Sequence, residues 1–91
     1  MDWDRIEDQF DVDLPQDQPI LPFNVVCEIV GIQYYLLHEM IKEGIIRQML
    51  KARNKKLLSL RDVKRIKYAK YLIEEKGVNL KGVKVIFEIE E

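Results

Sequence analysis

The sequence predicts a mostly helical domain, with four helices and one small two-stranded hairpin. Three observations carry this prediction. Apolar residues recur at three- and four-residue spacing in four separate stretches, which is the helical period. Gly31, Gly44 and Gly77 each follow such a stretch, at a point where a helix would end. Short apolar pieces flank a polar, basic loop around Asn54, which is typical of a hairpin.

The length and composition restrict the class of protein. A chain of 91 residues is enough for one small domain. No apolar run approaches the length of a membrane span, and the acidic start has no apolar secretion segment, so we expect a cytoplasmic protein. Cys27 is the single cysteine and His38 the single histidine, which leaves too few ligands for a metal centre. Without a nucleophile–base pair or a phosphate-binding glycine loop, we expect neither an enzyme nor a cofactor.

Residues 1–22 are expected to form an acidic, largely disordered N-terminal tail, followed by the domain at 23–91. The tail holds seven acidic residues and one basic residue. The prolines in LPQDQPILP bias their neighbours towards an extended chain. Two roles stay open for the acidity: it shields basic residues of the same or a neighbouring molecule, or it only aids solubility.

The first helix is expected over the stretch VVCEIVG, with Asn24 as its N-cap. Gly31 is expected to end this helix in the left-handed conformation. Its apolar side consists of Val25, Val26, Ile29 and Val30. Cys27 has no base nearby, so we interpret it as a small packing residue rather than a nucleophile.

A second helix is expected from Tyr34 to Glu43, opened by Gln33 and ended by Gly44. Two helices joined by a glycine turn within about twenty residues are the pattern of a helix-turn-helix. The residues expected on its buried side are Leu36, Leu37, Met40 and Ile41. Those expected on its exposed side are Tyr34, Tyr35, His38, Glu39 and Lys42.

A hairpin, or wing, is expected next. Its apolar pieces are Ile45–Ile46 and Leu57–Leu58, and its loop is centred on residues 52–55. Asn54 tolerates a positive φ better than its neighbours and is placed at the tip. Several cations near the tip make this hairpin a poor apolar element but a reasonable contact for phosphate.

Two further helices complete the domain. Ser59 and Asp62 predict a capping box at the start of a third helix that runs to Lys76. Gly77 ends it, and Asn79 caps a last helix in LKGVKVIFEIEE. The third helix carries Tyr68 and Tyr71, which either contact a sugar-phosphate chain or cover the edge of the core.

Charge is strongly segregated, although the net charge is only −1. Residues 47–72 hold a single acid, Asp62, and ten bases: Arg47, Lys51, Arg53, Lys55, Lys56, Arg61, Lys64, Arg65, Lys67 and Lys70. Such a block is the electrostatic footprint expected for a phosphate backbone. The basic block is explained equally well by a solvated helix face next to a charged turn, with no ligand.

The complete order is that of a winged helix-turn-helix, and here the sequence resembles the MerR superfamily, in particular its HspR-type heat-shock repressor branch. VVCEIVGI resembles the first helix and turn, and EGII the segment before the wing. KKLLSLRDVKRI resembles the start of the third helix, and LIEEKGVNLKGVKVIFEIE the terminal segment of HspR-like proteins. The resemblance covers Leu21 to Glu91.

The resemblance implies a DNA-binding repressor of chaperone operons whose partner is double-stranded promoter or operator DNA. The helix at 33–42 would enter the major groove, and the wing at 51–56 would lie along the adjacent backbone. Arg61 and the start of the third helix would meet a phosphate. The nucleic-acid-binding residues implied are Gln33, Tyr34, Tyr35, His38, Lys42, Lys51, Arg53, Asn54, Lys55, Lys56 and Arg61.

The sequence departs from the family inside the second helix. The family arginine and aromatic residues are replaced at His38, Glu39 and Met40, and an aromatic residue at the end of the wing is replaced by Leu58. MerR-like chaperone modulators of the CbpM type also lack that arginine set, so a chaperone-binding module with little or no DNA binding is the alternative. No heptad seam follows the last helix, so a homodimer would form through that helix, through the tail or only on DNA.

Overall fold

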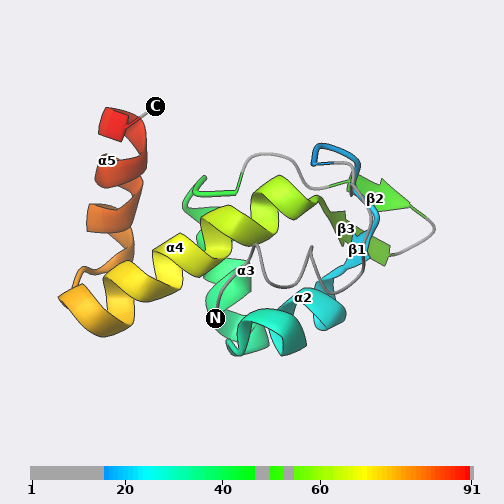
Figure 1. Ribbon diagram of the computed structural model, residues 1–91, viewed down its shortest axis with the longest axis horizontal. Coiled ribbons are helices and arrows are strands. Elements are labelled where there is room, and N and C mark those ends of the chain that lie inside the picture. The colour runs from blue at the N-terminus through cyan, green and yellow to red at the C-terminus, as the bar shows by residue number, and fades with distance from the viewer. Residues whose placement is uncertain (1–15, 47–49, 53–54, 91) are drawn as a thin grey trace.

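The computed structural model describes residues 16–46, 50–52 and 55–90, and it has the predicted architecture (Figure 1). The elements are β1 (Leu21–Pro22), α2 (Phe23–Val30), α3 (Tyr34–Lys42), β2 (Leu50–Ala52), β3 (Lys55–Leu58), α4 (Leu60–Lys76) and α5 (Leu80–Glu90). The long α4 crosses the middle of the molecule. In the view of Figure 1, α2 and α3 lie below it, the sheet lies at one end, and α5 stands at the other.

The predicted hairpin is confirmed, and a third strand extends it. β2 and β3 pair antiparallel, with Leu50 opposite Leu57 and Lys51 opposite Lys56. On the other edge of β3, the two residues of β1 pair antiparallel with Leu57 and Leu58. Residues 21–22 were expected to belong to the tail, but they lie in the sheet as β1. The predicted disorder of the first fifteen residues lies outside the described part of the chain.

Two expectations at the edges of elements are wrong. Asn24 does not cap α2, because the helix begins at Phe23 with Pro22 as its N-cap, and no side chain caps it. Pro22 belongs to β1, and this pairing sets where the helix can begin. Ile45–Ile46 is not a hairpin strand, since β2 begins at Leu50. Both isoleucines are instead buried in the core after the Gly44 turn.

The predicted limits of α4 and the start of α5 are confirmed. The Asp62 backbone N–H donates to the Ser59 hydroxyl at 3.1 Å, and the Ser59 N–H donates to the Asp62 carboxylate at 3.0 Å. Gly77 ends α4 with φ at 66°. The Asn79 side chain then accepts from the Gly82 N–H at 2.8 Å, which caps α5.

One apolar core joins every helix to β3. Its largest fully buried side chains come from five elements and the turn after α3: Val26, Leu37, Met40, Ile45, Leu58, Val63, Ile66 and Val83. Burying one such side chain stabilises the fold by about 1.5–3 kcal/mol. Leu37 and Met40 therefore anchor α3 by one face and turn its other face to solvent. Among the described residues, no helix is long and apolar enough to span a membrane.

Candidate nucleic-acid interface

The outer face of α3 carries the side chains that the sequence analysis selected for DNA contact. Gln33 is the N-cap residue, in an extended conformation and without a capping side-chain bond. Tyr34 and Tyr35 follow in the first turn, with 53% and 71% of their surface exposed. His38 is exposed one turn later, and Lys42 is exposed in the last turn. Polar and aromatic groups therefore gather at the beginning of this helix.

The turn at Gly31 sets the position of α3 relative to α2. Gly31 has φ at 79°, and its N–H donates to the Cys27 carbonyl at 2.8 Å. A side chain there would be strained, because this left-handed conformation favours glycine. The Lys70 ammonium, reaching from α4, donates to the Val30 carbonyl at 3.0 Å and so caps the end of α2. A hydrogen bond from α4 therefore stabilises the turn of the predicted helix-turn-helix.

Cys27 is half-buried beside this turn. Burial raises the pKa of its thiol, which disfavours the reactive thiolate. Its packing against the core agrees with the structural role expected from the sequence.

An aromatic cluster fastens the start of α3 to the start of α2. The buried ring of Phe23 lies 4.5 Å from the Tyr34 ring and 6.2 Å from the His38 ring, between centroids. The Tyr34 and His38 rings are stacked at 6.1 Å. Such ring pairs typically add about 0.5–1.5 kcal/mol beyond the area they bury. Sequence reasoning missed Phe23, because no local period connects it to a helix eleven residues later.

The same cluster joins α3 to the wing. The Lys56 ammonium of β3 lies 5.3 Å from the centroid of the Phe23 ring, within the range of a cation–π contact. It also lies 3.5 Å from Nδ1 of His38. A lysine ammonium can only donate, so Nδ1 accepts from Lys56 in the tautomer whose ring proton is on Nε2. In that tautomer His38 has an N–H donor on the other side of its ring.

The wing places cations at regular strand positions. Lys51 is directly opposite Lys56, and Lys55 is opposite Ala52. Of Lys51 and Lys55, the structure gives the strand position only, while Arg53 and Asn54 lie outside the described residues. Like charges at opposed strand positions weaken a hairpin in water.

Arg61 does not join the group formed by α3 and the wing. Its guanidinium Nε lies 2.9 Å from the Asp17 carboxylate, and both side chains are about two-thirds exposed. Its backbone N–H donates to the Gln16 carbonyl at 3.0 Å. Together with the capping box, this bond occupies backbone donors at the start of α4 that were expected to meet a phosphate. An ion pair with Asp17 fits the interpretation in which acidic residues shield basic ones.

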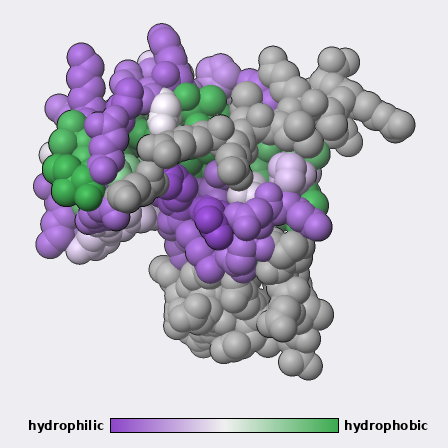
Figure 2. Space-filling view, turned by 90° about the horizontal axis from the view of Figure 1, so that it is seen from above, coloured by the Kyte–Doolittle hydropathy of each residue, from purple (hydrophilic) through white to green (hydrophobic). Residues whose placement is uncertain are grey.

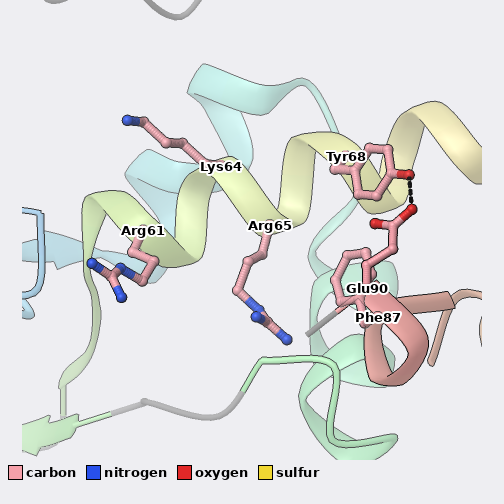
Figure 3. A pocket seen from close by; sticks show the side chains of 6 residues that line it. All are labelled: Arg61, Lys64, Arg65, Tyr68, Phe87 and Glu90. Atoms are coloured by element: carbon pink, nitrogen blue, oxygen red, sulfur yellow. Dashed lines mark hydrogen bonds between the residues drawn. The ribbon is translucent and has the colours of Figure 1, made fainter. Parts of the chain in front are cut away.

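Arg61 instead lines a hollow between α4 and α5, of about 320 Å³. Figure 3 shows its lining residues: Arg61, Lys64, Arg65 and Tyr68 from α4, and Phe87 and Glu90 from α5. The Tyr68 hydroxyl donates to the Glu90 carboxylate at 3.0 Å. This hydrogen bond, with burial and the nearby negative charge, raises the pKa of Tyr68.

Two cations of the basic block bind the chain's own backbone. Arg65 donates to the Ile45 carbonyl from Nε at 3.2 Å and from Nη2 at 3.0 Å, and its guanidinium lies 4.9 Å from the Phe87 centroid. Lys70 donates to Val30, as described above. The charge count therefore overstates the number of cations that are available to a phosphate chain.

Most of this chain is similar to known proteins. Residues 21–89 match the sequence profile of the MerR HTH family of regulatory proteins, a range that runs from β1 into the last turn of α5. A Streptomyces coelicolor protein with the provisional name heat shock protein HspR is 26% identical over 78 residues, which cover 86% of this chain. The chain spans about half (52%) of the length of that curated relative.

Proposed function

The chain belongs to the MerR HTH family of regulatory proteins, and from this premise we propose that it is a repressor that binds double-stranded DNA through α3 and the wing. The observation that carries the proposal is the contact between Lys56, His38 and Phe23. Through it, the exposed face of α3 is in contact with β3 of the hairpin. The similarity to HspR directs the proposal towards promoters of heat-shock genes.

In this proposal α3 lies in the major groove, which admits one helix. Gln33, Tyr35 and His38 reach base edges from its first two turns. An amide such as that of Gln33 can pair with both N6 and N7 of adenine. The Nε2–H of His38 offers a single donor, where the family arginine would offer a bidentate one, so base reading is less selective here.

The wing supplies most of the affinity. Lys51, Arg53, Lys55 and Lys56 would follow the phosphate backbone beside the groove, with Arg61 as a further contact if it leaves Asp17. Four or five phosphate contacts predict a slope of about −3.6 to −4.5 for log K against log salt concentration. Strong salt dependence is thus the signature of this binding mode.

Lys56→Gln tests the proposal on a described residue. Fluorescence anisotropy with DNA from upstream of the protein's own gene should show an affinity several-fold lower than wild type. It should also show a salt slope smaller by about one, because one phosphate contact is lost.

Lys76→Gln is the matched control, since it removes the same charge from an exposed position at the far end of α4. We expect it to change the affinity little. Absence of wild-type binding even at low salt would rule out the proposal. If the two variants lost the same DNA affinity, Lys56 would contribute only through the net charge of the protein and not through a specific phosphate contact.

A further inference from the structure

The hollow between α4 and α5 has an apolar wall made by two parallel rings. The Tyr68 and Phe87 rings are stacked, with 5.6 Å between their centroids and 3° between their planes. Tyr68 is 37% exposed and Phe87 only 6%, so the tyrosine ring forms most of the accessible wall. Figure 2 shows apolar side chains at the α5 end of the molecule, bordered by hydrophilic ones. A flat apolar group fits beside such rings, because aromatic groups favour offset stacking.

The charges around the hollow are separated by sign. Arg61 and Arg65 are one helical turn apart on α4, and Figure 3 shows both guanidinium groups on one side of the helix, while Lys64 points to the other. Arg65 is held in place by its two backbone hydrogen bonds. Glu90 lies beside the aromatic wall, bonded to the Tyr68 hydroxyl. An anionic group is therefore attracted to the arginine side of the hollow and repelled from the Glu90 side.

A carboxylate of the chain itself already lies on the arginine side. The Asp17 carboxylate is 2.9 Å from Nε of Arg61, and both side chains are about two-thirds exposed. It marks the place where the carboxylate of a ligand would pair. An exposed ion pair of this kind is weak, so a ligand that adds ring contacts can replace Asp17 at low cost.

We propose that the hollow between α4 and α5 binds a small planar aromatic carboxylate, which takes the place of Asp17. The carboxylate of the ligand pairs with Arg61, near the fixed charge of Arg65, and its ring lies against Tyr68. The hollow of about 320 Å³ is at the lower end of the range for ligand sites, which limits the ligand to about one or two fused rings. This inference goes beyond the proposed function, because it requires neither DNA nor the outer face of α3.

An NMR titration of the nitrogen-labelled 91-residue chain with naphthalene-2-carboxylate, in the absence of DNA, tests the site. The amide signals that shift should be those of residues 61–68 in α4 and 87–90 in α5. For a ligand this small we expect a dissociation constant on the order of 1 mM. Naphthalene-2-carboxamide, which has the same shape without the charge, should bind about fivefold more weakly or worse, because it loses the charge-assisted pair with Arg61.

Two variants should change the affinity for naphthalene-2-carboxylate in opposite directions. Arg61→Gln should weaken binding about three- to fivefold, since the ion pair is lost. Asp17→Asn should strengthen it by up to about fivefold, because the competing carboxylate is removed. Lys76→Gln is the matched control for Arg61→Gln, with a positive charge lost at an exposed position at the far end of α4, and it should bind like wild type.

The proposal would be overturned if the signals of α4 and α5 did not shift at ligand concentrations up to about 10 mM. Equal binding of the carboxylate and the carboxamide would also overturn it, as would equal losses in Arg61→Gln and Lys76→Gln. If Asp17→Asn bound the ligand no better than wild type, the ligand would not take the place of Asp17. Circular dichroism of each variant verifies that these exposed substitutions leave the fold intact.

Discussion

Arg65 shows that a cation in a basic segment can serve the fold rather than a ligand. Its two hydrogen bonds to the Ile45 carbonyl satisfy an acceptor on a residue that is only 1% exposed. A buried carbonyl without a donor costs about 1–3 kcal/mol. Its stacking over Phe87 further connects α4 to α5. The residue therefore holds three segments together: α4, α5 and the turn after α3.

Arg65→Met tests this structural role. We expect a loss of about 1–3 kcal/mol in the free energy of unfolding, since the carbonyl loses a charged donor. Urea denaturation monitored by circular dichroism measures it. Arg61→Met, at an exposed position in the same helix, should cost less than about 1 kcal/mol, because its pair with Asp17 is solvated. If both variants lost the same free energy of unfolding, Arg65 would not have a structural role that Arg61 lacks.

Individual residues were predictable where their signal is local. Gly31, Ser59 and Asn79 act on backbone groups within a few residues of themselves, and their roles followed from sequence spacing. The partners of Phe23 and Arg65 lie many residues away, and only the packed structure brings them together. For the same reason a count of charges could not separate the cations that bind carbonyls from those that face solvent.

Among the elements, the four helices and the hairpin were predicted because each repeats its pattern over several residues. The two-residue β1 has no period to detect, and it exists only because an open edge of β3 accepts it. Pro22 is tolerated there because an edge strand need not use every N–H. The predicted start of α2 was wrong for the same reason, because β1 determines where this helix begins.

The contribution of the capping box to the stability of α4 can be tested by substitution at Ser59. Ser59→Ala removes the acceptor of the Asp62 N–H and should lower the free energy of unfolding by about 1–2 kcal/mol. Ser59→Thr keeps the hydroxyl and should retain most of the stability. Thermal denaturation of both variants beside wild type gives the comparison. If alanine and threonine proved equally stable, the cap would not limit the stability of α4.

For the whole molecule, the net charge of −1 is compatible with binding a polyanion because the charges are segregated. Segregation has a second consequence, since acidic residues of the chain can compete with DNA for basic ones. Asp17 already pairs with Arg61, and Gln16 holds the backbone N–H of that arginine. The acidic segment thus occupies a position that the family resemblance assigns to a phosphate.

Asp17→Asn should therefore strengthen DNA binding. The substitution frees the Arg61 guanidinium and removes a negative charge beside the basic block, and an exposed ion pair of about 0.2–1 kcal/mol predicts a gain of up to about fivefold. The gain should be largest at low salt and fade as the Debye length falls below about 10 Å.

Glu74→Gln alters the net charge equally, but at the far end of α4, so it measures the effect of total charge alone. A titration of both variants from low to high salt separates these effects. If the two gains were equal, Asp17 would act only through total charge. If Asp17→Asn bound DNA no better than wild type, Arg61 would not be a phosphate contact.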